Sequence, residues 1–291
     1  MEQKKINVLN RNIAYLDSMS GELGTILFIH GNSFSSKTFS KQFESSIFEG
    51  YRLLALDLYG HGDSENLLNP FGYHLPQYAK LVVEFIKELG LSNIIIAGHS
   101  LGGHIALELL THNIEGLVSG VFIWGTPPLS NPIKEVSAFL PNPAGAYLYQ
   151  SNLSEKESIE FVSQCFGQWT EELSEMVKIV RKTSADARPS LGASVGQLNF
   201  ADEVKAIEKA PFKVAVVYGT EDRLIDAAHF KSIDIKNLWN GQAHPLNGSH
   251  FCHIDKVDEF NLLFLDYVQD YTAHMVSPKY NEAAATLSLL Q

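Results

Sequence analysis

The sequence predicts an α/β fold in which a doubly wound, mostly parallel sheet of eight strands carries an inserted helical lid. Two observations support this prediction. Short, continuously apolar runs alternate with segments of helical period, as in sheets covered by helices on both faces. The alternation stops near residue 128 and resumes near residue 213, and the stretch between is too apolar to be a linker. We therefore expect a core at 1–128 and 201–272, a lid at 129–200 and a C-terminal tail at 273–291.

The sheet is expected to begin with a hairpin. Residues 6–9 and 13–17 are read as two short edge strands joined by a polar turn at 10–12. The other strands are predicted from continuous apolar runs, and they lie at 25–29, 52–58, 94–97, 118–124 and 213–218. Helices are predicted from apolar residues spaced three and four apart, and they lie at 37–48, 75–89, 153–166, 171–181 and 257–271, with one more after residue 102.

Charge and composition restrict the classes of partner. The chain of 291 residues has a formal net charge of −11, which argues against nucleic acid and disfavours an anionic membrane surface. Its two cysteines, Cys165 and Cys252, are too few for a disulfide framework, and a single bridge between them stays open. Because no signal-like segment or membrane-length apolar run is found, we expect a cytoplasmic protein without an anchor. We expect the protein to be a monomer or a homodimer.

The segment Gly98-His99-Ser100-Leu101-Gly102 fits the pattern G-x-S-x-G. A buried strand precedes it and a helix follows, which is the context in which this pattern forms a strained strand-to-helix turn. Such a turn lifts the serine hydroxyl above the sheet, and the helix directs its N-terminus toward that hydroxyl. We therefore predict that Ser100 is a nucleophile.

A serine nucleophile needs a base to take its proton and an acid to orient that base. In an open α/β sheet, these groups lie in loops at the carboxyl ends of later strands. Asp222 comes just after the strand at 213–218, and His250 lies in the loop before the last helix. The order Ser100, Asp222, His250 therefore predicts a catalytic triad. The alternatives are Glu221 and Asp226 for the acid, and His244 and His253 for the base.

The negative oxygen of an acyl-transfer intermediate needs backbone N–H donors. Leu101 follows the nucleophile and is predicted to supply one of them. Asn32 is predicted to supply the other, because Gly31 lets the chain turn toward Ser100 after the strand at 25–29. The Asn32 side chain is also a candidate hydrogen-bond partner of the substrate.

The chain resembles the α/β-hydrolase superfamily over nearly its whole length, through the motifs FIHGNS, LDLYGHGDS, AGHSLGG, VYGTEDRLI and GSHFCHID. This resemblance places the nucleophile, acid and base at Ser100, Asp222 and His250. It places the oxyanion donors at Asn32 and Leu101. Within the superfamily, the stretches HGNS, WGTPP and NLWNGQAH are most similar to the serine-dependent N-acyl-homoserine lactonases. The resemblance implies hydrolysis of a small-molecule ester or lactone through an acyl-enzyme, without a cofactor.

Other readings of the sequence compete with a lactonase. A general carboxylesterase would use the same residues on another acyl substrate, and a non-catalytic ligand-binding receptor of this fold can keep an intact triad. A metal hydrolase is disfavoured, because the histidine groups at 61–63 and 250–255 lack the spacing of zinc sites. No metal is therefore expected. Dehalogenases and epoxide hydrolases of this fold use an aspartate nucleophile where this chain has Ser100.

The lid is expected to choose the substrate. Its aromatic residues are candidates for an acyl pocket, with Phe161 and Trp169 as the predicted substrate contacts, although such residues also form the small core of a lid. The full set is Phe139, Tyr147, Tyr149, Phe161, Phe166 and Trp169.

Overall fold

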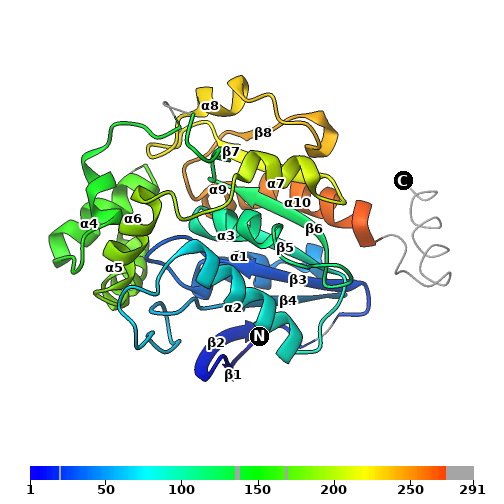
Figure 1. Cartoon of the computed structure of the whole chain (residues 1–291), viewed down its shortest axis with the longest axis horizontal. Helices are drawn as coiled ribbons and strands as arrows, with labels where there is room; N and C mark the ends of the chain where they lie inside the picture. The colour runs from blue at the N-terminus through cyan, green and yellow to red at the C-terminus, as the bar shows by residue number, and fades with distance from the viewer. Residues whose placement is uncertain (20, 135–137, 168–169, 273–291) are drawn as a thin grey trace.

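The computed structural model describes residues 1–19, 21–134, 138–167 and 170–272, and these contain one sheet of eight strands (Figure 1). The strand order is β1-β2-β4-β3-β5-β6-β7-β8. β2 pairs antiparallel with β1 and with β4, and all other pairs are parallel, which confirms the predicted fold class. The strands are β1 Glu2–Val8, β2 Arg11–Asp17, β3 Gly24–Ile29, β4 Tyr51–Leu56, β5 Ile94–His99, β6 Val118–Trp124, β7 Val214–Gly219 and β8 His244–Leu246.

The N-terminal hairpin differs from its prediction in two respects. Its turn consists of Leu9 and Asn10, both with positive φ (51° and 61°), rather than of residues 10–12. β2 is not an edge strand, because it pairs with β1 on one side and with β4 on the other. Ile13 and Tyr15 of β2 are buried, and β1 alone forms this edge of the sheet.

The opposite edge is formed by β8, which the sequence pattern does not predict. This strand has three residues, and one of them is Pro245. A run so short gives no periodic signal, and proline is tolerated in a sheet at an edge because it lacks an N–H.

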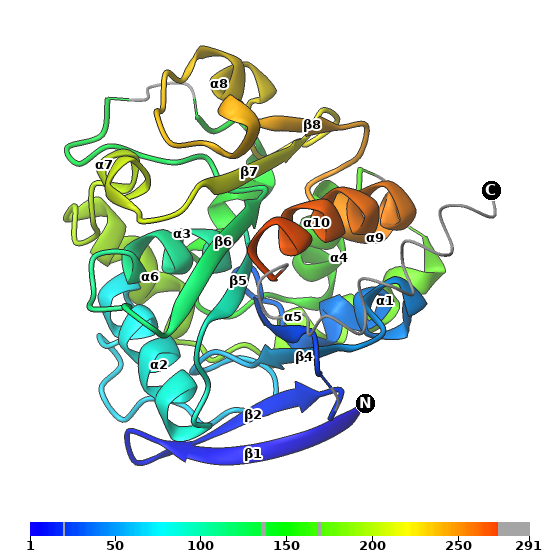
Figure 2. The same ribbon diagram turned by 90° about the vertical axis from the view of Figure 1, so that its right-hand side faces the viewer.

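Helices cover both faces of the sheet, and Figure 2 shows α2 and α3 on one side and α1 and α10 on the other. In β5, Ile94 and Ile96 share a core cluster with residues of α2 and α3, whereas Ile95 and Ala97 share one with residues of α10. Burial on both faces explains why this strand is continuously apolar. These helices are α1 Ser40–Glu44, α2 Leu75–Glu88, α3 Leu101–Leu109, α8 Ala227–Ser232, α9 Cys252–Asp255 and α10 Val257–Thr272.

Short 3-10 helices accompany the core. The single helix predicted at 37–48 is instead three pieces, because α1 lies between η1 and η2. Serines stand at the junctions, and serine has a lower preference for helix interiors than straight-chain residues have. The 3-10 helices of the core are η1 Ser36–Phe39, η2 Ser46–Phe48 and η5 Trp239–Gly241.

The described residues between β6 and β7 form helices and contribute no strand to the sheet. We refer to residues 129–200 as the lid, and Figure 1 shows α4, α5 and α6 together beside one end of the sheet. The start of α4 has a capping box, in which Ser154 and Glu157 bind each other's backbone N–H groups. The helices of this part of the chain are η3 Pro143–Leu148, α4 Glu155–Cys165, η4 Glu171–Leu173, α5 Ser174–Lys182, α6 Ala187–Gly196 and α7 Glu203–Lys209.

The two cysteines, Cys165 and Cys252, are buried and carry free thiols, so no disulfide joins them. Among the described residues, no helix combines the length and the apolar character that crossing a lipid bilayer requires. The tail predicted at 273–291 lies outside the described residues.

Candidate functional site

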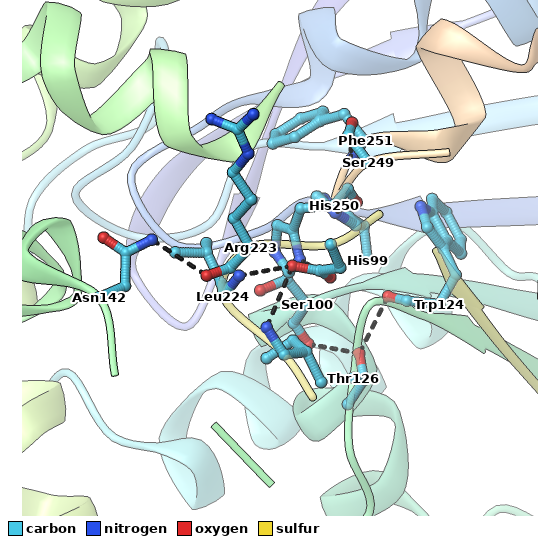
Figure 3. Close-up of polar contacts among 12 residues, drawn as sticks. His99, Ser100, Trp124, Thr126, Asn142, Arg223, Leu224, Ser249, His250 and Phe251 are labelled. Carbon is cyan, nitrogen blue, oxygen red and sulfur yellow. Dashed lines mark hydrogen bonds and ion pairs between the residues drawn. The ribbon is translucent and has the colours of Figure 1, made fainter. Parts of the chain in front are cut away.

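Ser100 lies at the tight turn between β5 and α3, with φ of 52° and ψ of −116°. Residues with a Cβ rarely adopt positive φ, so neighbouring groups must hold this turn. The Ser100 N–H donates to Trp124 O at 2.9 Å, and Ser100 O accepts from Thr126 Oγ1 at 2.8 Å (Figure 3). The end of β6 and the residues just after it therefore fix the turn that carries the serine.

The same turn needs a close approach of α3 to β3. A Cβ on Gly102 would lie 2.0 Å from Ile29 O, and a backbone atom inside a sheet cannot move aside. Glycine is therefore required at this position. The approach brings the first turn of α3 beside the loop that follows β3, which contains Asn32.

His250 and Asp222 form a buried acid–base pair. His250 Nδ1 donates to Asp222 Oδ2 at 2.7 Å, and the two residues are 4% and 8% exposed. The other carboxylate oxygen, Asp222 Oδ1, accepts from the N–H groups of Leu224 and Ile225 at 2.8 and 3.1 Å. The carboxylate is therefore held in one orientation, and it fixes the imidazole tautomer that leaves Nε2 as the basic atom.

Ser100 and His250 face one another across a cavity of about 10 Å³ that both residues line, together with Asn32 and Leu224. Figure 3 shows the two labelled side chains next to each other. The structure thus brings together the three residues predicted as a triad, from the turn after β5, the loop after β7 and the loop after β8.

His99, the residue before the serine, binds the main chain of the base His250. Its Nε2 donates to His250 O at 2.9 Å, and its ring is fully buried. Burial, with the nearby His253 and His250, lowers the pKa of His99 well below its usual range, so the ring is neutral at neutral pH. The sequence gives no signal for this role, because the pattern G-x-S-x-G leaves the position unspecified.

The alternative acids have other environments. Glu221 is exposed to solvent. Asp226 caps α8 by accepting from Ala228 N at 2.8 Å. Of the three carboxylates in this loop, Asp222 is the one in contact with His250.

The alternative bases are engaged in packing. His253 is fully buried and accepts from Trp124 Nε1 at 2.9 Å, and burial, with His250 nearby, lowers its pKa to about 3. His244 lies against Trp239, with ring centroids 4.8 Å apart. Neither histidine is placed with Ser100 at the cavity that His250 lines.

Asn32 and Leu101, the predicted oxyanion donors, both line a pocket beside Ser100. Within the described residues, neither backbone N–H donates a hydrogen bond to the protein, so each is available to a ligand oxygen. The Asn32 side chain is already engaged, because its Nδ2 donates to Leu148 O of the lid at 3.0 Å. The lid therefore fixes the orientation of this side chain, and its contact with a substrate stays a prediction.

The pocket beside Ser100 lies between core and lid and has a volume of about 130 Å³. Of the lid aromatics predicted as candidates for an acyl pocket, Phe139 and Tyr149 reach it and are each 50% exposed. A wall of this kind accepts the hydrocarbon part of a substrate. Its apolar residues other than these two are Leu75, Leu101, Leu129, Ile133, Leu148, Leu191, Val195 and Phe200.

Polar atoms reach the same pocket from His104 and Glu203. His104 Nδ1 lies 2.7 Å from Glu203 Oε1, and Glu203 Oε2 accepts from Leu129 N at 2.8 Å. Both carboxylate oxygens are therefore occupied. Among the described residues, His104 Nε2 has no hydrogen-bond partner, so it is the polar atom of this pair that a ligand can use.

Of the two lid residues predicted to contact the substrate, Phe161 does not line this pocket. Phe161 is 1% exposed and lines the smaller cavity behind Ser100 and His250. Its ring stacks on Phe34 with centroids 5.9 Å apart. Trp169 lies outside the described residues.

In the described parts of the chain, no three His, Cys, Asp or Glu side chains converge in the manner of metal ligands. In the group at 61–63, His61 Nδ1 donates to Tyr59 O at 2.9 Å, whereas Asp63 pairs with Lys182. The side chains of that group thus point to separate partners.

Known families and structures match this chain over most of its length. The model of the alpha/beta hydrolase family matches residues 26–261. The N-acyl homoserine lactonase AidH, solved in complex with N-butanoyl homoserine, is 28% identical, with a TM-score of 0.85 over 94% of this chain and 98% of that chain. A mutant of AidH complexed with N-hexanoyl homoserine lactone is 27% identical, with a TM-score of 0.86 over 94% and 99% of the two chains. These matches confirm the resemblance predicted from the motifs.

Two other relatives have different named activities. A 2-hydroxy-6-oxononadienedioate/2-hydroxy-6-oxononatrienedioate hydrolase of Pseudomonas putida is 23% identical over 275 residues, which are 89% of this chain and 93% of that protein. A non-heme haloperoxidase of Rhodococcus erythropolis is 33% identical over 126 residues, which span only 41% of this chain and 44% of that protein. The relatives thus agree on the framework and differ in the reaction.

Gly219, at the end of β7, lets the Asp222 loop approach the His250 loop, since a Cβ there would lie 2.2 Å from Ser249 O. We expect Gly219→Ala to push the loops apart, to lower ester or lactone hydrolysis about tenfold or more, and to lower Tm by about 4 °C or more. The matched control is Gly196→Ala, where the added methyl group meets nothing within 4 Å. Full activity of Gly219→Ala would show that the spacing of the loops is not critical.

Proposed function

We infer that this chain, which belongs to the alpha/beta hydrolase family, hydrolyses a carboxylic ester or lactone through an acyl-enzyme on Ser100. The observation that carries this proposal is the buried pair of His250 and Asp222, 2.7 Å apart, behind a serine at a strained turn. This combination activates a hydroxyl for attack on an acyl carbon.

In the proposed mechanism, His250 Nε2 takes the proton of Ser100 Oγ as that oxygen attacks the carbonyl carbon. The N–H groups of Asn32 and Leu101 stabilise the oxyanion, and Asp222 stabilises the imidazolium. His250 then protonates the leaving oxygen and later activates a water that releases the acid. For a lactone, the leaving alcohol stays tethered to the acyl group. No step requires a cofactor.

An N-acyl-homoserine lactone is the substrate that we propose. Two features of the pocket support it, namely the apolar wall, which suits an acyl chain, and His104 Nε2, which suits the amide group of such a lactone. The likeness to AidH, whose solved complexes contain N-acyl homoserine ligands, supports it as well. A general carboxylesterase is the alternative, because its chemistry would use the same three residues.

The test is a hydrolysis panel in which N-acyl-homoserine lactones of several acyl lengths compete with p-nitrophenyl and alkyl esters. We expect the lactones to have the highest kcat/KM, and we expect Ser100→Ala to lower every rate by about a thousandfold or more. If only the open-chain esters were hydrolysed, the proposed activity would be that of a carboxylesterase and not of a lactonase. Ligand binding without any turnover that depends on Ser100 would favour a receptor.

The identity of the acid is tested by two isosteric variants. Asp222→Asn removes the charge that holds His250 and is expected to lower kcat by about four orders of magnitude, with a residue of activity above the uncatalysed rate. The control is Glu221→Gln, which changes an exposed carboxylate in the same loop and should leave kcat unchanged. An inactive Glu221→Gln beside an active Asp222→Asn would reverse the assignment.

Acyl length is expected to be set by Phe200, which lines both the pocket and a surface groove of about 690 Å³. The pocket is close in size to a cavity of about 150 Å³ that holds one benzene molecule, so we expect it to favour short acyl chains over long ones. Phe200→Ala joins the pocket to the groove and should raise kcat/KM for long chains relative to short ones about tenfold. Leu110→Ala, which widens only the groove, is the control. An unchanged chain-length profile in Phe200→Ala would show that Phe200 is not the limit.

A further inference from the structure

Arg188, on α6 of the lid, is a buried cation whose contacts are all with neutral groups. The residue is 1% exposed, and burial lowers its pKa to about 10, which leaves it charged at neutral pH. Among the described residues, no carboxylate forms an ion pair with its guanidinium. Burying a charge without an ion-pair partner costs free energy. The hydrogen bonds of this side chain must therefore explain why the charge is buried here.

Three hydrogen bonds hold the guanidinium. Nε donates to Ser33 Oγ at 2.7 Å, Nη1 donates to Ser151 O at 3.0 Å, and Nη2 donates to Val180 O at 2.6 Å. The two carbonyl groups belong to the lid, whereas Ser33 belongs to the core loop after β3. Arg188 therefore joins the lid to the residue that follows Asn32.

Ser33 extends this contact to the candidate oxyanion donor. Its Oγ donates to Asn32 Oδ1 at 3.3 Å, and Asn32 Nδ2 donates to Leu148 O of the lid at 3.0 Å. The Ser33 carbonyl accepts from Thr183 Oγ1 at 3.1 Å, and the φ of Ser33 is 72°, which residues with a Cβ avoid. The lid thus binds the side chains of Asn32 and Ser33 in this strained turn, and it also binds the carbonyl group of Ser33.

We propose that Arg188 is a positioning residue that, through Ser33, keeps the Asn32 N–H directed at the oxyanion. The proposal rests on the acyl-enzyme chemistry proposed for Ser100. Arg188 does not line the pocket beside Ser100, so its effect falls on the transition state and not on substrate binding. Docking of the lid is then a condition for turnover and not only for substrate selection.

The experiment compares Arg188→Met, Ser33→Ala and the double variant. For each we would measure kcat, KM, Tm and the affinity for an alkylboronic acid, which adds to a serine as a tetrahedral mimic of the intermediate. We expect kcat to fall about 10- to 100-fold, KM to change less than about threefold, and boronate affinity to fall in parallel with kcat/KM. The double variant should lose no more than the more affected single variant, because both changes break one chain of contacts.

The control is Arg181→Met, which removes an arginine of the lid that is half exposed and 3.7 Å from Glu155. Its kcat should equal that of the wild type. If Arg188→Met does not fold, Ser33→Ala decides, because it removes only the hydroxyl. A folded Ser33→Ala that keeps its kcat and boronate affinity overturns the proposal, while turnover that depends on Ser100 upholds the proposed function. Absence of any such turnover in the wild type overturns both.

Discussion

The backbone of Ser100, held at positive φ, is the constraint from which the arrangement of the site follows. A turn this tight presses α3 against the end of β3, where only a residue without a side chain fits, and Gly102 meets that need. It also sets Ser100 against the end of β6, where Trp124 and Thr126 bind its main chain. The loops after β3, β5 and β6 therefore meet at the carboxyl ends of the parallel strands. The lid lies beside that end of the sheet, and the pocket beside Ser100 lies between lid and core.

Elements with strong local patterns are predictable from the sequence, and elements that depend on distant partners are not. The continuous apolar run at 94–97 predicts β5, because each of its faces is covered, and the helical spacing at 75–89 predicts α2, which ends at Glu88. The three residues of β8 are a strand because β7 pairs with them. β2 is interior because β4 lies beside it, and nothing within the hairpin sequence encodes that neighbour.

In the candidate site, too, the features with a local sequence signal are predictable and those that depend on distant contacts are not. Asp222 is predicted from its position after a strand and His250 from its loop before the last helix, and the structure places Asp222 Oδ2 2.7 Å from His250 Nδ1. The pocket wall depends on how the lid packs on the core, so composition cannot rank the lid aromatics, and Phe139 lines the pocket while Phe161 packs behind the serine. Arg188 gives no signal in sequence, because only the folded lid turns an arginine of a helix inward, toward Ser33.

The junction between lid and core leaves the lid free to diversify. The carbonyl group of Leu148 accepts directly from Asn32 of the core, and the carbonyl groups of Ser151 and Val180 hold Arg188, whose Nε donates to Ser33 of the core. Every amino acid supplies the same carbonyl, so replacing a side chain at these three positions leaves the hydrogen-bond acceptors in place. Leu148 lines the pocket while its carbonyl holds Asn32. Natural or laboratory selection can therefore change the side chain at position 148, and with it the substrate range, while the main-chain hydrogen bond to Asn32 is kept.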